Sequence, residues 1–135
     1  MPRPMKTRPV SAAQVRAYAG KSDEYAAAAA NELAVGRCTA ATSLAIHAAI
    51  NAADAVCGAR LGHRAAGDDH DQALTLLRQA GPDGAAIESD LRRLLPLKTK
   101  AEYDFDDIAP AVAAKAVERA QRCTAIARRV ANSIR

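Results

Sequence analysis

The stretch TAATSLAIHAAINAADAVCGAR, residues 39–60, is the longest uninterrupted helical segment that the sequence predicts. Small residues dominate almost every face of it, and alanine favours helix over strand because it loses no side-chain entropy when the helix forms. Other helices can approach such a surface closely. We therefore expect residues 39–60 to form the central helix of an all-α fold.

A line of polar side chains interrupts this small-residue surface. The steps between its members are four, four and three residues, which places Ser43, His47, Asn51 and Asp54 along one side of the helix. Polar groups on so buried a helix need partners. For Asp54 we expect pairing with an arginine or lysine from elsewhere in the bundle, in preference to a catalytic role.

Further helices are predicted on both sides of the central one. The pattern Ser-x-x-Gln at 11–14 is typical of a capping box, and it begins a helix that reaches about residue 35 and is ended by Gly36. Three segments follow residue 60. They are a short helix capped by Asp68 or Asp69 and closed by the turn AGPDG at 80–84, a helix through Ile87 that ends at Pro96, and a last helix capped by Asp106 or Asp107. Residues 97–107 are expected to be a polar segment.

These elements predict one domain, residues 11–135, built as an antiparallel up-and-down bundle of four long helices plus one short helix. No strand-like alternation of useful length appears. Residues 1–10, which are basic and rich in proline, are expected to form a flexible N-terminal segment.

The composition agrees with a closely packed helical core. Hydrophobic residues make up 50% of the chain but aromatic residues only 3%, and there is no Trp, so the core must consist of Ala, Leu, Val and Ile. The net charge of +4 is unevenly distributed, because residues 115–135 hold six Lys or Arg against one acid, Glu118. The last helix is therefore predicted to carry a basic line beside its apolar stripe.

The cysteines and the N-terminus indicate the compartment. Cys38, Cys57 and Cys123 are odd in number and lie on predicted apolar helix faces with no Cys-x-x-Cys pair, so we expect buried thiols in a reducing environment. The start of the chain lacks the apolar run of a signal peptide, and no stretch approaches the roughly 18 uninterrupted apolar residues of a membrane span. A cytoplasmic location without a membrane is the expectation.

The segment RLGHRAAGDDHDQALTLL, residues 60–77, holds the densest collection of reactive side chains. Arg64 and His70 form an Arg-x5-His pair, in which the imidazole could move a proton at neutral pH and the guanidinium could hold a scissile phosphate. Asp69 could orient His70. In the alternative interpretation, Asp69 caps a helix while Arg64 and His70 are solvated. Acids beside His70 would also repel a phosphate backbone.

Neither a metal nor a cofactor is predicted. Cys57, His63 and His70 can be considered as metal ligands, but their spacing matches no familiar site and the thiol is expected to point into the core. A wider set of residues could form an electropositive groove for RNA if it converges with Arg64, although a solvated charged face is the plainer account. This set consists of Arg60, His63, Lys98, Lys100, Tyr103, Arg119 and Arg122.

The order of three motifs resembles the HEPN domain superfamily over residues 11–132. The motifs are AATSLAIHAAINAADAV with His47, then DDHDQALTLL with His70 followed by Leu74, Leu76 and Leu77, then LPLKTKAEYDF with Lys98 or Lys100 followed by Ala101, Glu102, Tyr103 and Asp104. The resemblance implies a helical bundle that usually dimerises. Many members are metal-independent RNases with an Arg-x4-6-His motif, which the spacing of Arg64 and His70 fits. Ala65 departs from the polar residue that often follows that arginine.

Three hypotheses result. In the first, the chain is a HEPN-type metal-independent endoribonuclease or toxin-like RNase, with copies of Arg64 and His70 paired across a homodimer. In the second, it is a non-catalytic HEPN module that binds RNA, a nucleotide or a nucleotidyltransferase-type antitoxin partner, as the resemblance also allows. In the third, it is a purely structural bundle.

Overall fold

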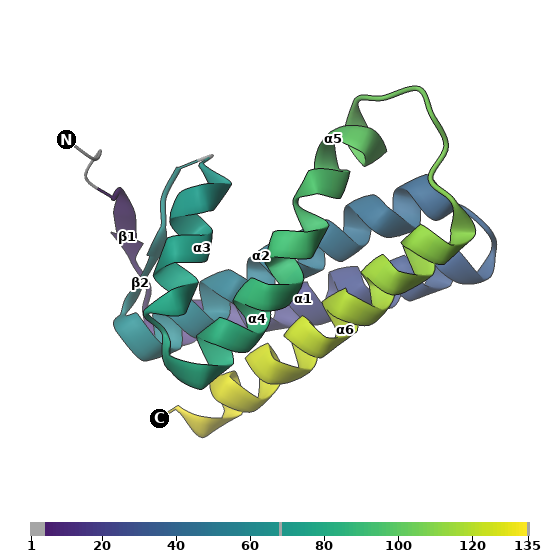
Figure 1. Ribbon diagram of the computed structural model, residues 1–135. Coiled ribbons are helices and arrows are strands. Elements are labelled where there is room, and N and C mark those ends of the chain that lie inside the picture. The colour runs from purple at the N-terminus through teal and green to yellow at the C-terminus, as the bar shows by residue number, and fades with distance from the viewer. Residues whose placement is uncertain (1–4, 68, 135) are drawn as a thin grey trace.

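The computed structural model describes residues 5–67 and 69–134, which form six helices and two short strands (Figure 1). Helices account for 78% of the described residues, so the fold is predominantly helical. In chain order the elements are β1 (Thr7–Pro9), α1 (Ala12–Ala34), α2 (Cys38–Leu61), β2 (His63–Ala65), α3 (His70–Arg78), α4 (Gly81–Leu94), α5 (Pro96–Glu102) and α6 (Pro110–Ser133). The predicted four long helices and one short helix differ from this set, because only α1, α2 and α6 exceed 20 residues.

The three long helices pack against one another and form the core, with α2 central as predicted (Figure 1). Most buried residues of α2 are alanines, and Ala45, Ala48, Ala49 and Ala52 have no exposed surface. One buried polar node joins all three helices. Ser22 Oγ donates to the Ala48 carbonyl at 2.8 Å and lies 2.8 Å from Thr124 Oγ1.

The start of α1 follows the sequence prediction. Gln14 N–H donates to Ser11 Oγ at 3.2 Å, and Ser11 N–H donates to Gln14 Oε1 at 2.9 Å, which completes the capping box. Gly36, just beyond the last turn, has a φ of +81°, a left-handed conformation that glycine adopts without steric cost. Both ends of α1 are therefore fixed by local sequence.

The N-terminal strand was not predicted. β1 pairs antiparallel with β2, with Arg8 opposite Arg64, and Val10 N–H donates to the Gly62 carbonyl at 2.9 Å. Val10 packs into the core against Gly58, where a Cβ would lie 2.6 Å from Val10 Cγ1. Residues 7–10 of the segment expected to be flexible are thus held against the domain.

Three helices begin differently from the prediction because proline opens each of them. Pro82, Pro96 and Pro110 all occupy the first turn of a helix, where a missing N–H costs nothing and the fixed φ is already helical. The segment 80–84 accordingly starts α4, and Pro96 starts α5 within the segment predicted to be polar and irregular. Ala109, and neither Asp106 nor Asp107, is the N-cap of α6.

Candidate functional site

Arg64 lies on β2 and is half-buried against α1 and α2. Its Nη1 donates to the Ala65 carbonyl at 2.9 Å, and its guanidinium carbon is 5.8 Å from the centre of the Tyr18 ring. Burial raises the pKa of Asp54 to about 6, and the positive charge of Arg64 acts in the opposite direction. Asp54 is therefore a half-buried acid whose charge is influenced by that of Arg64.

His70 is the first residue of α3. The preceding residue, Asp69, is the N-cap, and its Oδ1 accepts the Asp71 N–H at 3.0 Å. Asp68, the other predicted cap, lies outside the described residues. His70 Nε2 lies 3.3 Å from the Nζ of Lys98 on α5. Because an ammonium can only donate, this contact requires an imidazole whose Nε2 is unprotonated.

The structure thus gives His70 a cationic neighbour other than the expected one. Arg64 contacts Ala65 and the Tyr18 ring, and its charge lowers the pKa of Asp54 against the effect of burial. Sequence reasoning placed Lys98 only at the edge of a basic surface. Nothing in the spacing between residues 70 and 98 indicates this contact, because it depends on how α5 packs on α2 and α4. The carboxylate of Asp69 caps α3 by accepting a backbone N–H, which is the helix-capping role considered as the alternative to orienting His70.

Two of the predicted RNA-contacting arginines on α6 are paired with an acid on α4. Arg119 Nη1 lies 2.9 Å and Arg122 Nη2 2.7 Å from Asp90 Oδ1. Burial acts to raise the pKa of Asp90, yet the hydrogen bonds from Arg122 and Arg119 outweigh it and the net shift is downward. Asp90 therefore balances much of the charge that these arginines were expected to offer to RNA.

Arg60, at the end of α2, is paired in a similar way. Its Nη2 lies 3.0 Å from Asp83 Oδ2, and Arg129 Nη2 lies 2.7 Å from Asp83 Oδ1. The hydrogen bonds from Arg129 and Arg60 lower the pKa of Asp83. This triad connects α2, α4 and α6, and it explains the position of Arg60 without an RNA ligand.

The other residues predicted to contact RNA lie on β2 and around α5. His63 opens β2, opposite Pro9, and is half-buried. Lys100 is exposed on α5, and the side chain of Tyr103 is exposed at its end. Among the predicted surface residues, Lys98 is the one for which the structure gives a contact with a predicted catalytic side chain.

The polar line on α2 finds its main partner on α5. His47 Nε2 lies 3.7 Å from Glu102 Oε1, and Ser43 Oγ donates to the same oxygen at 3.5 Å. The Tyr25 ring lies 5.5 Å from the His47 ring, while Asn51 donates to the His47 carbonyl within α2. The histidine of the first HEPN-like motif thus meets the glutamate of the third.

The cysteines are of two kinds. Burial raises the pKa of both Cys57 and Cys123 to about 12, so these thiols are protonated and unreactive at neutral pH. Cys38, at the first turn of α2, is only half-buried, which corrects the expectation of three buried thiols. Over residues 5–67 and 69–134, no group of three or more His, Cys, Asp or Glu side chains is arranged to hold a metal ion.

By length and composition alone, α2 is apolar enough to cross a membrane. Buried positions make up 61% of its most apolar window, and the core helix of a soluble protein passes the same test. Its many contacts with α1 and α6 account for this composition. No known protein family and no curated protein matches the chain.

Proposed function

We propose that this chain is an RNA-directed protein of the HEPN type in which His70 and Lys98 contact the phosphodiester. The observation that carries the proposal is the 3.3 Å separation of His70 Nε2 and Lys98 Nζ. Cleavage of a phosphodiester without a metal needs a proton acceptor and a positive charge close to each other. Both side chains are half-buried, and they belong to two different short helices, α3 and α5.

The specific form of the proposal is a metal-independent endoribonuclease. His70 would take the proton from a ribose 2′-hydroxyl at Nε2 once the Lys98 ammonium moves from that nitrogen to the phosphoryl oxygens. The 2′-oxygen attacks the adjacent phosphorus, the bond to the 5′-oxygen breaks, and the leaving oxygen takes a proton from solvent, to which the imidazolium later returns its own. The products are a 2′,3′-cyclic phosphate and a 5′-hydroxyl. Lys98 would stabilise the negative charge that develops on the phosphoryl oxygens. The sequence predicts Arg64 for this role. From its position on β2, next to α3, Arg64 would add only to the positive charge around the phosphate.

Several further expectations belong to the same proposal. The bundle would consist of α1, α2, α4 continued by α5, and α6, arranged up and down as in HEPN domains. The protein would be cytoplasmic and homodimeric, and it would be toxin-like, with a nucleotidyltransferase-type antitoxin as partner. Sedimentation equilibrium of the purified chain tests the dimer directly.

A second candidate function is a non-catalytic HEPN module that binds RNA, a nucleotide or the same type of partner. It is favoured by the contacts of Arg64, which face Tyr18 and Asp54, and by the acids Asp69 and Asp71 at the start of α3. Carboxylates so close to the imidazole weaken phosphate binding and would leave His70 without a substrate to act on.

The decisive experiment compares cleavage of bulk RNA in EDTA by the wild type and by single variants. We expect His70→Ala and Lys98→Ala each to lower the rate at least ~100-fold, because each removes a group that acts in the transition state. Lys21→Ala is the matched control, since this exposed lysine lies on α1 and outside the predicted RNA-contacting set. Arg64→Ala, measured in parallel, tests the sequence-based pair.

Each result has a defined meaning. Loss of cleavage in Arg64→Ala but not in Lys98→Ala would return the role to Arg64 and overturn the assignment to Lys98. Absence of cleavage by the wild type, with RNA binding that weakens steeply as salt rises, would replace the nuclease by the binding module. Absence of both cleavage and binding would overturn the RNA-directed function.

A further inference from the structure

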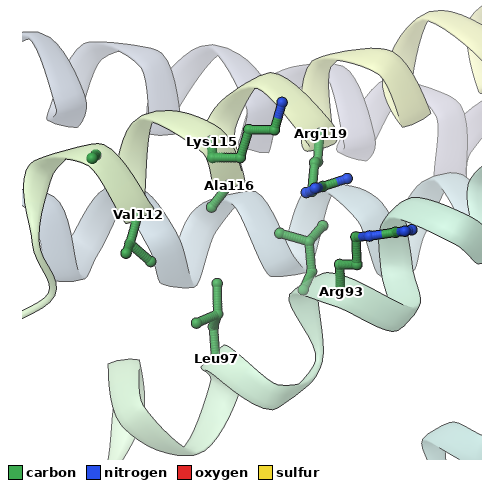
Figure 2. A pocket seen from close by; sticks show the side chains of 8 residues that line it. Arg93, Leu97, Val112, Lys115, Ala116 and Arg119 are labelled. Carbon is green, nitrogen blue, oxygen red and sulfur yellow. The ribbon is translucent and has the colours of Figure 1, made fainter.

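A pocket of about 340 Å³ lies between the end of α4, the start of α5 and the first turns of α6. We call it the α5–α6 pocket. Its volume falls within the range of small-molecule sites, at the lower end. The lower part of Figure 2 shows Leu97 and Val112 facing each other across it, with Ala116 above them. Leu94 and Ala111 complete an aliphatic lining.

Three cations lie toward the other end of this pocket. Figure 2 shows the guanidinium groups of Arg93 and Arg119 close together, with the ammonium of Lys115 extending above them. Among the residues that the structure describes, no acidic side chain lines the pocket. The pocket is therefore polarised, with an apolar end between Leu97 and Val112 and a positive end beside the two arginines.

Both guanidinium groups are held in place by contacts outside the pocket. Arg119 Nη1 donates to Asp90 at 2.9 Å, and Arg93 Nη1 donates to Ser89 Oγ at 2.8 Å. Each guanidinium has five N–H donors, so donors remain after these bonds are made. Side chains fixed in this way lose little further rotamer entropy when they bind an anion.

We propose that the α5–α6 pocket binds a small aliphatic carboxylate, with its chain between Leu97 and Val112 and its carboxylate at Arg93 and Arg119. A planar guanidinium matches the two oxygens of a carboxylate. Nucleotides fit less well, because the lining contains no aromatic ring on which a base could stack. Val112 is 39% exposed, and an aliphatic chain would cover it.

Calorimetric titration of the full chain with octanoate tests this site. Acetate supplies the charge without the chain, and octanol supplies the chain without the charge. Because the pocket is polarised, we expect octanoate to bind at least about tenfold more tightly than either, a difference of about 1.4 kcal/mol. Equal binding of acetate or of octanol would overturn the proposal.

Variants at exposed positions locate the binding. Arg93→Gln removes one cation of the pocket, and the matched control Arg92→Gln alters the neighbouring arginine, which does not line it. We expect Arg93→Gln to weaken octanoate binding at least about fivefold and Arg92→Gln less than about twofold. Val112→Asp, which places a negative charge at the apolar end, should abolish it. Unchanged melting temperatures show that the variants are folded.

Two further outcomes would overturn the assignment. These are the absence of octanoate binding up to about 10 mM, a concentration that would detect very weak affinity, and tighter binding of adenosine monophosphate than of octanoate. Neither His70 nor Lys98 lines the α5–α6 pocket. RNA cleavage and octanoate binding are therefore measured on different residues, and failure of one proposal leaves the other standing.

Discussion

The long-helix core differs in construction from the end of the molecule where β1, β2 and α3 lie together, which we call the short-element end (Figure 1). In the core, α1, α2 and α6 approach closely because α2 presents alanines without exposed surface. The short-element end carries the predicted reactive side chains His63, Arg64 and His70, and the buried residues of α3 are Leu74, Leu76 and Leu77. Close backbone packing leaves no room for long polar side chains, so these gather where the elements are short.

The polar groups of the two regions differ in the same way. In the core, the hydroxyls of Ser22 and Thr124 satisfy each other and a carbonyl without charge. At the short-element end, the contact of His70 with Lys98 joins two titratable groups, and both are half-buried. The core is therefore expected to be sensitive to volume, and the short-element end to charge and pH.

The largest effect should come from adding volume to the core. We expect Ser22→Leu to destabilise the protein by about 3–5 kcal/mol, because it overpacks the contact of three helices and leaves the Thr124 hydroxyl without its nearest partner. Urea denaturation followed by circular dichroism measures the change. Ser22→Ala, which loses the hydrogen bond but adds no volume, should cost only about 1 kcal/mol. Similar values for both variants would show that the core has spare room.

A smaller but still large effect is expected where a charge lies at the edge of the core. Asp90 is 6% exposed and holds Arg119 and Arg122. Its replacement by alanine should cost about 2–3 kcal/mol, since it leaves the half-buried Arg119 without its anion. The exposed Asp106 provides the control, for which Asp106→Ala should change the free energy of unfolding by less than about 0.5 kcal/mol. A loss that disappears in high salt would show that the pair is only a surface interaction.

The parts of the fold that follow from local sequence were predictable. The capping box at Ser11 and the cap at Asp69 depend on residues within one turn, and the position of α2 follows from its small side chains. The strands were not predictable, because β1 and β2 each have three residues and are held by backbone hydrogen bonds between distant segments. The sequence predicts the end of a helix at Pro96, although proline is also favoured in the first turn of a helix, and Pro96 begins α5.

The candidate site is predicted from the sequence as a set of residues and not as a geometry. The sequence pairs Arg64 with His70 on spacing alone, whereas β2 places the Arg64 guanidinium over Tyr18. His70 contacts Lys98 of α5, and this helix begins at Pro96, where the sequence predicts that a helix ends.

The acid on the boundary between the two regions should make stability depend on pH. Burial raises the pKa of Asp54 from 3.8 to about 6, so the folded protein holds this proton more tightly than the unfolded chain does. Asp54 therefore destabilises the fold increasingly as pH rises from about 4 to about 6, and by a constant amount above that. We expect Asp54→Asn to stabilise the protein by about 1–2 kcal/mol at pH 8 and hardly at all near pH 4. Urea denaturation at several pH values measures this. A gain that is independent of pH would contradict the raised pKa.

The smallest effect concerns the cap of α3, which keeps His70 at the start of a nine-residue helix. Asp69→Ala removes the acceptor of the Asp71 N–H and should cost about 1 kcal/mol, whereas Asp69→Asn keeps a good capping side chain and should cost only a few tenths. Because so short a helix depends on its cap, hydrogen exchange should accelerate in residues 70–78 of the alanine variant while the amides of α2 remain protected. Equal acceleration in α2 would mean that the short-element end and the long-helix core unfold as one unit, and the distinction between the two regions would then describe only their composition.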